Sequence, residues 1–259
     1  MLDLVKISRK VIFFSFCLLF FLIPLIISPF NFELFEFPKM ILIYLLTILI
    51  TSAWLMEMAA SRKIIFKNSF WNLPLLAFLL TQALATLLSI NPHTSLWGYY
   101  SRFHGGLLST ISYLILYWAF ESHLSKKETQ KSITFLLTSA GLVSFYGIAE
   151  HFGIDKDYWV QDVQRRVFST LGQPNWLAAW LAALIPLSLD SSLGRLFLAK
   201  TAITKKQKLL KIPFSQLAYL LLTLILTACL FFTKSRSGLL GLATGLMVFF
   251  GFYFQEKIK

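Results

Sequence analysis

Long runs without a charged residue alternate with short charged segments along this chain. Eight runs of 17 or more residues lack Asp, Glu, Lys and Arg: 11–32, 40–56, 68–101, 103–120, 132–149, 167–189, 212–233 and 237–255. A helix needs roughly 20 apolar residues to cross a hydrocarbon core of about 30 Å, and most of the runs approach that length. The pattern therefore predicts an all-α, polytopic integral membrane protein with about eight transmembrane helices and no soluble domain.

Turn residues refine the boundaries of these helices. Asn91-Pro92 ends the apolar part of the third run, and the 172–175 turn delays the start of the sixth helix, with Asn175 or Thr170 as its candidate cap. We expect a single transmembrane domain over residues 1–259, with spans at about 11–30, 39–57, 70–90, 104–121, 132–150, 175–193, 213–233 and 237–254.

The first apolar run could also belong to a cleaved signal peptide, because basic residues precede it. Pro24, Pro29 and Phe30 stand where such a peptide has small residues at its cleavage site, so we interpret the run as a retained helix. Cys17 and Cys229 both lie inside apolar runs, which favours two small buried residues over a disulfide or a metal site.

Composition agrees with a membrane environment and charge predicts the orientation. Hydrophobic residues make up 57% of the chain, and only 14% of its residues are charged. With eight spans and the N-terminus in the cytoplasm, the inner segments hold 17 of the 24 Lys and Arg residues. This bias follows the positive-inside rule, so both termini are expected in the cytoplasm.

The formal charge of +12 raises the question of an anionic partner. The basic residues lie in short loops beside apolar helices and form no basic groove, which excludes a nucleic-acid-binding protein. Membrane lipids with anionic headgroups are the expected partners. The basic stretch 195–211 is either an amphipathic helix on the membrane surface or a solvated loop, and its pattern does not choose between them.

Three polar segments on the expected outer side interrupt the apolar pattern: 95–106, 165–176 and 233–238. The third holds Lys234 and Arg236 in a turn too short to reach far into water. Arginine binds oxyanions bidentately, and the N-terminus of the following helix would add backbone N–H groups, so the segment suits a phosphate. The alternative is an interface anchor or a partner for Asp155, Asp157 or Asp162.

Other catalytic chemistry has little support in the sequence. The four histidines, at positions 93, 104, 123 and 151, show no metal-ligand spacing. There is no glycine-rich phosphate loop, Cys-x-x-Cys pair or Gly-x-Ser-x-Gly elbow, so a soluble-type hydrolase or ATPase is not supported.

Four segments together resemble the O-antigen ligase and O-antigen polymerase superfamily of bacterial envelope enzymes. They are Phe-Glu-Phe-Pro-Lys at 35–39, Ser-Leu-Trp-Gly at 95–98 with Arg102 and Gly105-Gly106, Leu-Gly-Gln-Pro-Asn-Trp-Leu-Ala at 171–178, and Thr-Lys-Ser-Arg-Ser-Gly at 233–238. Their order along the chain and their expected outward position carry the resemblance.

The resemblance implies an enzyme that needs neither cofactor nor metal and acts in the bacterial cytoplasmic membrane. It would transfer a glycan from undecaprenyl pyrophosphate to a lipid or sugar acceptor at the outer face. Arg236 is then the first candidate for holding the pyrophosphate, followed by Arg102, Arg165, Arg166 and Lys234. The residues expected to shape the motifs are Gly98, Gly105, Gly106, Gly172, Pro174, Asn175, Ser235 and Gly238.

Members of this family continue past the Ser-Arg-Gly segment into a long outer loop with the proposed catalytic histidine. The resemblance thus implies that residues 1–259 correspond to the N-terminal portion of such an enzyme, and that the chain alone would lack the catalytic base. Two other classes stay open: a membrane transporter similar to bicarbonate-uptake proteins, and a noncatalytic scaffold of an envelope-polysaccharide complex.

Overall fold

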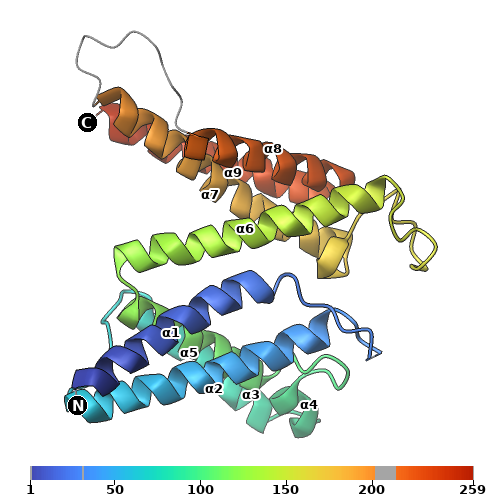
Figure 1. Cartoon of the computed structure of the whole chain (residues 1–259). Helices are drawn as coiled ribbons and strands as arrows, with labels where there is room; N and C mark the ends of the chain where they lie inside the picture. Colours follow the sequence, from blue (N-terminus) through green and yellow to red (C-terminus); the bar gives the residue numbers. More distant parts are fainter. Residues whose placement is uncertain (1, 31, 202–213, 259) are drawn as a thin grey trace. The chain divides into compact units, whose positions relative to one another are not determined.

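A computed structural model describes residues 2–30, 32–201 and 214–258, and these residues form helices and loops without a strand (Figure 1). The elements in chain order are α1 Leu2–Leu22, α2 Glu36–Ser61, α3 Asn72–Leu87, α4 Pro92–Trp97, α5 Leu107–His123, α6 Lys126–His151, the 3-10 turn η1 Ser169–Leu171, α7 Pro174–Thr201, α8 Phe214–Phe232 and α9 Arg236–Ile258.

Five of the described helices are long and apolar enough to cross a membrane: α2, α6, α7 over Pro174–Leu193, α8, and α9 over Arg236–Gln255. The protein is therefore an all-helical, multi-pass membrane protein. The three other expected spans, in α1, α3 and α5, do not meet the same measure within the described residues. At 16 residues, α3 is about 24 Å long, which is less than the hydrocarbon thickness of about 30 Å.

The first helix lies earlier in the chain than its expected span of 11–30. It begins at Leu2, includes the basic residues that precede the apolar run, and ends at Leu22, after which the chain turns. Pro24 explains the early end, because proline lacks the N–H needed to continue a helix and its ring disfavours the helical conformation in the preceding residue.

The start of α6 differs from the expected one, and α7 begins about where expected but without its expected caps. Ser125 and Glu128 form a capping box, with Ser125 N and Oγ donating to Glu128 Oε2 at 2.9 and 2.6 Å, so α6 begins at Lys126 rather than near 132. Neither Asn175 nor Thr170 caps α7, because the helix already begins at Pro174 and Thr170 lies in η1. The basic stretch 195–211 continues α7 as far as Thr201, and its remainder lies outside the described residues.

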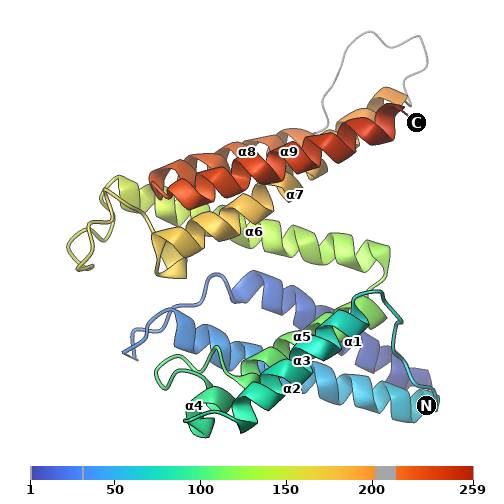
Figure 2. The same cartoon turned by 180° about the vertical axis from the view of Figure 1, so that it is seen from behind.

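The chain divides into two compact units, Met1–Leu136 and Leu137–Lys259. In the first unit α2 packs against α1 and α5, while α3 and α4 also contact α5 (Figure 2). Its core joins Ile12 and Phe16 of α1, Ile50 and Ala53 of α2, and Ala119 of α5.

The second unit is built around α7. Figures 1 and 2 both show α8 and α9 alongside α7, and α7 contacts each of them. Leu181 and Ile185 of α7 are buried, as are Leu226 and Leu230 of α8. Glycine lets α6 approach α8 closely, since a Cβ added to Gly147 would lie 2.9 Å from the sulfur of Cys229 in α8.

Candidate functional site

Two buried hydroxyl side chains shape the turn between α8 and α9. Ser235 caps α9, with its Oγ accepting a hydrogen bond from the backbone N–H of Gly238 at 3.3 Å. The Oγ1 of Thr233 accepts from the backbone N–H of Ser235 at 3.2 Å. A Cβ added to Gly238 would come within 2.5 Å of the Cβ of Ala178, so the first turn of α9 packs directly on α7.

Arg166 connects this turn to the start of α7. Its Nε donates to the backbone oxygen of Thr233 at 3.1 Å, and its Nη2 donates to Oδ1 of Asn175 at 3.1 Å. The backbone N–H of Val167 also donates to the carbonyl of Phe232, at 3.3 Å. The two polar segments 165–176 and 233–238 therefore meet at one arginine, and we name this place the Arg166 junction.

Three further cations belong to the same two segments. Arg165, Lys234 and Arg236 are exposed, and none of their side chains makes an ion pair or a hydrogen bond within the described residues. Asp162 accepts instead from the backbone N–H of Arg165 at 3.0 Å, and Asp155 accepts from a tyrosine hydroxyl at 2.8 Å. The described part of the chain thus provides no acidic partner for these cations.

The Arg166 junction has the chemistry of an anion-binding surface. The helices α7 and α9 both begin there, and the first N–H groups of a helix carry a partial positive charge. A guanidinium group has five N–H donors in a planar fork, and the two bonds of Arg166 leave donors for a ligand. Exposed cations beside a half-buried arginine suit an extended polyanion such as pyrophosphate.

A buried carboxylate supports the segment that carries Arg166. Glu150, 0% exposed, accepts through Oε2 from the backbone N–H groups of Phe168 and Ser169 at 3.3 and 2.7 Å. Ser169, which has a φ of +51°, donates its hydroxyl to the carbonyl of Val143 at 2.7 Å. Glu150 was not predicted from the sequence, because a carboxylate at the end of a charge-free run is typical of an ordinary helix terminus.

The segments 35–39 and 95–106 meet in the first unit. The rings of Phe37 and Phe103 are 5.8 Å apart between centroids, and the hydroxyl of Tyr44 donates to the backbone oxygen of Phe103 at 2.6 Å. Lys39 donates to the carbonyls of Ile26 and Phe35 at 2.9 and 3.2 Å, which ties the chain after α1 to the start of α2.

Arg102 differs from the cations of the Arg166 junction in being paired. It lies 3.4 Å from Glu33 Oε2 and 3.3 Å from Glu36 Oε1, and its guanidinium lies over the ring of Tyr99. The second carboxylate oxygen of Glu36 lies 2.7 Å from Nε2 of His104. An anion at Arg102 would compete with two carboxylates, so the structure gives less support to this candidate than to Arg166.

Two glycines of the same segment let the backbone cross itself. A Cβ at Gly98 would lie 2.3 Å from the backbone oxygen of His104, and a Cβ at Gly106 would lie 2.3 Å from the nitrogen of Gly98. Gly98 and Gly105 also have φ values of +85° and +81°, which side chains rarely adopt. Gly172, which precedes α7, also has a positive φ, of +76°.

A second cluster of polar side chains, which was not predicted from the sequence, lies near the C-terminal end of α2. Glu57 is 0% exposed and accepts from Nε of Arg9 at 2.7 Å, while its Oε2 lies 3.3 Å from Nε2 of the buried His123. The latter pair is close enough for an ion pair but does not have hydrogen-bond geometry. Trp54 packs edge-on against His123.

The described residues contain no group of three or more His, Cys, Asp or Glu side chains that could hold a metal ion. No protein-family model, no curated protein and no solved structure shows significant similarity to the chain.

Proposed function

We propose that the chain binds the pyrophosphate of a lipid-linked glycan at the Arg166 junction and takes part in transferring that glycan to a lipid or sugar acceptor. The donor implied by the resemblance of the motifs is a glycan on undecaprenyl pyrophosphate. The single observation that carries this proposal is the pair of bonds from Arg166 to Asn175 and Thr233. The bond to Thr233, which is 67 residues away in the sequence, joins the two motif segments.

The proposed role of the junction is electrostatic. In the transfer, the bond between the sugar carbon C1 and a pyrophosphate oxygen breaks while an acceptor hydroxyl oxygen bonds to C1. Negative charge then develops on the leaving pyrophosphate, where positioned cations and helix N-termini are most effective. Arg166, Lys234 and Arg236 supply these groups, and we assign the base that takes the hydroxyl proton to none of the described residues.

The full topology belongs to the same proposal. We propose eight spans with both termini in the cytoplasm of a bacterium, which places the Arg166 junction at the outer face of the inner membrane. In that arrangement the apolar helices beneath the junction would hold the polyprenyl chain of the donor. The membrane nature of the helices and the basic character of the expected inner loops support this arrangement.

The test is binding of radiolabelled undecaprenyl pyrophosphate to the purified chain in detergent. We expect the double variant Lys234→Ala/Arg236→Ala to bind at least about 100-fold more weakly, because two charge-assisted hydrogen bonds to an anion, at about 1.5–3 kcal/mol each, are lost. Lys63→Ala is the matched control, since Lys63 is also exposed and unpaired within the described residues but lies after α2. Equal loss in the control, or no loss in the double variant, would refute the anion site.

A transfer assay separates binding from catalysis. A version of the protein that transfers lipid-linked glycan in membranes should lose transfer with Arg236→Ala while inserting normally. Binding without transfer in any version would favour the noncatalytic scaffold, and solute flux in proteoliposomes would favour the transporter.

A further inference from the structure

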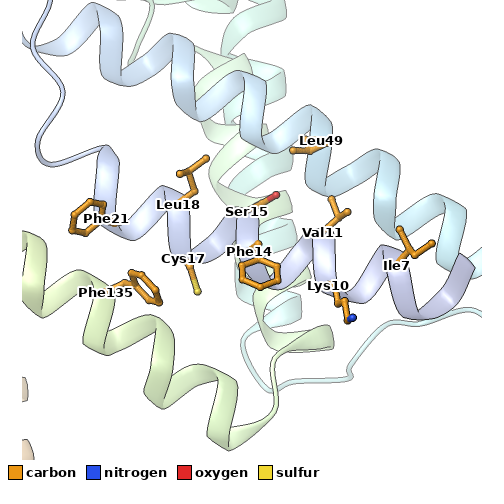
Figure 3. Close-up of a pocket in the computed structure, with 10 residues that line it drawn as sticks. All are labelled: Ile7, Lys10, Val11, Phe14, Ser15, Cys17, Leu18, Phe21, Leu49 and Phe135. Atoms are coloured by element: carbon orange, nitrogen blue, oxygen red, sulfur yellow. The ribbon is translucent and has the colours of Figure 1, made fainter. Parts of the chain in front are cut away.

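Two hollows of the described residues differ in their chemistry. The groove along α1 in the first unit has a volume of about 530 Å³ and is lined mostly by apolar side chains such as Phe14 and Leu18 (Figure 3). The hollow in the loop between α6 and α7 of the second unit has a volume of about 310 Å³ and is lined mostly by polar side chains. We name this second hollow the loop pocket, and its polar groups are specific enough to indicate a ligand.

The loop pocket presents both donors and acceptors of hydrogen bonds. Asp157 provides a carboxylate, and Gln161 and Gln164 provide amides that both donate and accept. These three side chains make no hydrogen bond or ion pair within the described residues, so they are available to a ligand. Trp159 adds an aromatic wall, and its ring packs edge-on against Phe168 at 5.4 Å between centroids.

This combination of groups suits a sugar. A sugar ring has hydroxyl groups around its rim and a face of C–H groups that packs on aromatic rings, so it needs a few placed polar groups and one apolar wall. Small-molecule sites have volumes of about 300–1,000 Å³, and the loop pocket is at the lower end of that range, which fits a monosaccharide or disaccharide. Asp157 and Asp162 outnumber Lys156 in the lining, so a sugar that carries a carboxylate would be repelled.

The loop pocket adjoins the Arg166 junction. The backbone N–H of Arg166 donates to the carbonyl of Asp162, a lining residue, at 3.1 Å. The backbone N–H of Arg165 donates to the side chain of the same aspartate at 3.0 Å. In a lipid-linked glycan the first sugar is bonded through its C1 to the pyrophosphate, so a site for that sugar must lie beside the anion site. The loop pocket meets this requirement.

We propose that the loop pocket binds the first sugar of the lipid-linked glycan and selects a neutral sugar over an acidic one. Asp157, Gln161 and Gln164 bind the hydroxyl groups of the ring, and Trp159 packs against its C–H face. This proposal rests on the proposed function, because it takes the pyrophosphate at the Arg166 junction as the neighbour of the sugar.

The experiment measures binding of undecaprenyl pyrophosphate diesters to the purified full chain in detergent. The second ester group is methyl, as the reference of equal pyrophosphate charge, or glucose, galactose, N-acetylglucosamine, N-acetylgalactosamine or glucuronic acid. At least one neutral sugar should raise the affinity about tenfold over the methyl ester, the effect of two hydrogen bonds of ordinary net strength, whereas glucuronic acid should not. The double variant Asp157→Ala/Gln161→Ala should lose this gain and bind the methyl ester as the unchanged protein does.

Asp190→Ala is the matched control and should keep the gain, since Asp190 is also exposed and unpaired within the described residues but lies in α7. The proposal is overturned if no neutral sugar binds better than the methyl ester, if glucuronic acid gains as much as glucose, or if the gain survives in the double variant. A failure of the anion site looks different, because the methyl ester would then bind equally to the unchanged protein and to Lys234→Ala/Arg236→Ala.

Discussion

At the residue scale, Glu57 and Glu121 show how differently two carboxylates of one unit depend on their partners. Glu57 has no exposed surface and meets Arg9 and His123, whereas Glu121 is 32% exposed and pairs with Lys67 at 2.6 Å. Water can replace a lost partner only at Glu121, because its side chain is partly exposed. A buried polar group left without its partner costs the full penalty of its desolvation.

We expect Glu57→Gln to lower the free energy of unfolding by about 1–3 kcal/mol, because His123 stays buried beside an amide. Glu121→Gln should cost less than about 1 kcal/mol, the range of exposed ion pairs. Denaturation in detergent followed by tryptophan fluorescence measures both, since Trp54 contacts His123. Equal losses for the two variants would contradict the burial of Glu57.

The two segments of the Arg166 junction were predicted from the sequence, but their meeting at Arg166 was not. The family resemblance made Arg236 the first candidate for the pyrophosphate and Arg166 a later one. The bonds of Arg166 reach to positions 175 and 233, and no local pattern reports such long-range pairing. Glu150 and Glu57 were missed for the same reason, because their partners lie on other segments of the chain.

At the scale of elements, the charge-free runs predicted where the helices lie more accurately than where they begin and end. Hydropathy measures which solvent a segment prefers, while a helix ends where caps and prolines interrupt its hydrogen bonds. The capping box of Ser125 sets the start of α6, and Pro24 sets the end of α1. The close packing of α9 on α7 is another element-level feature, and it depends on Gly238.

Two glycines of α9 give a matched test of that packing. Gly238→Ala should destabilise the second unit by about 1–3 kcal/mol, because the new methyl group would overlap Ala178. Gly241→Ala should be neutral or stabilising by up to about 1 kcal/mol, since nothing lies within 4 Å of its added Cβ and alanine favours helices. Thermal unfolding in detergent ranks the variants, and a reversed order would refute the contact between α7 and α9.

At the scale of the whole molecule, the predicted orientation rests on the uneven distribution of Lys and Arg between the loops. The helix α6 is suited to a test, because it is one of the five helices long and apolar enough to cross. Lys127 lies at its start, and Lys156 lies in the loop that follows it. The two positions should face opposite sides of the membrane.

We expect Lys156→Cys to react with a membrane-impermeant maleimide in spheroplasts, and Lys127→Cys to react only after permeabilisation. Both lysines are exposed, so the new thiols should be accessible. The natural cysteines Cys17 and Cys229 are 4% and 0% exposed, so the unchanged chain should give little background labelling. The opposite labelling pattern would invert the topology and place the Arg166 junction on the cytoplasmic side.

The way Arg166 is held also limits how its neighbourhood can evolve. Asn175 contributes a side-chain oxygen to the bond, whereas Thr233 contributes only its backbone carbonyl. A substitution of Asn175 that removes its side-chain oxygen therefore removes one of the two bonds that hold Arg166. A substitution at position 233 keeps the other bond, because any residue there presents the same carbonyl.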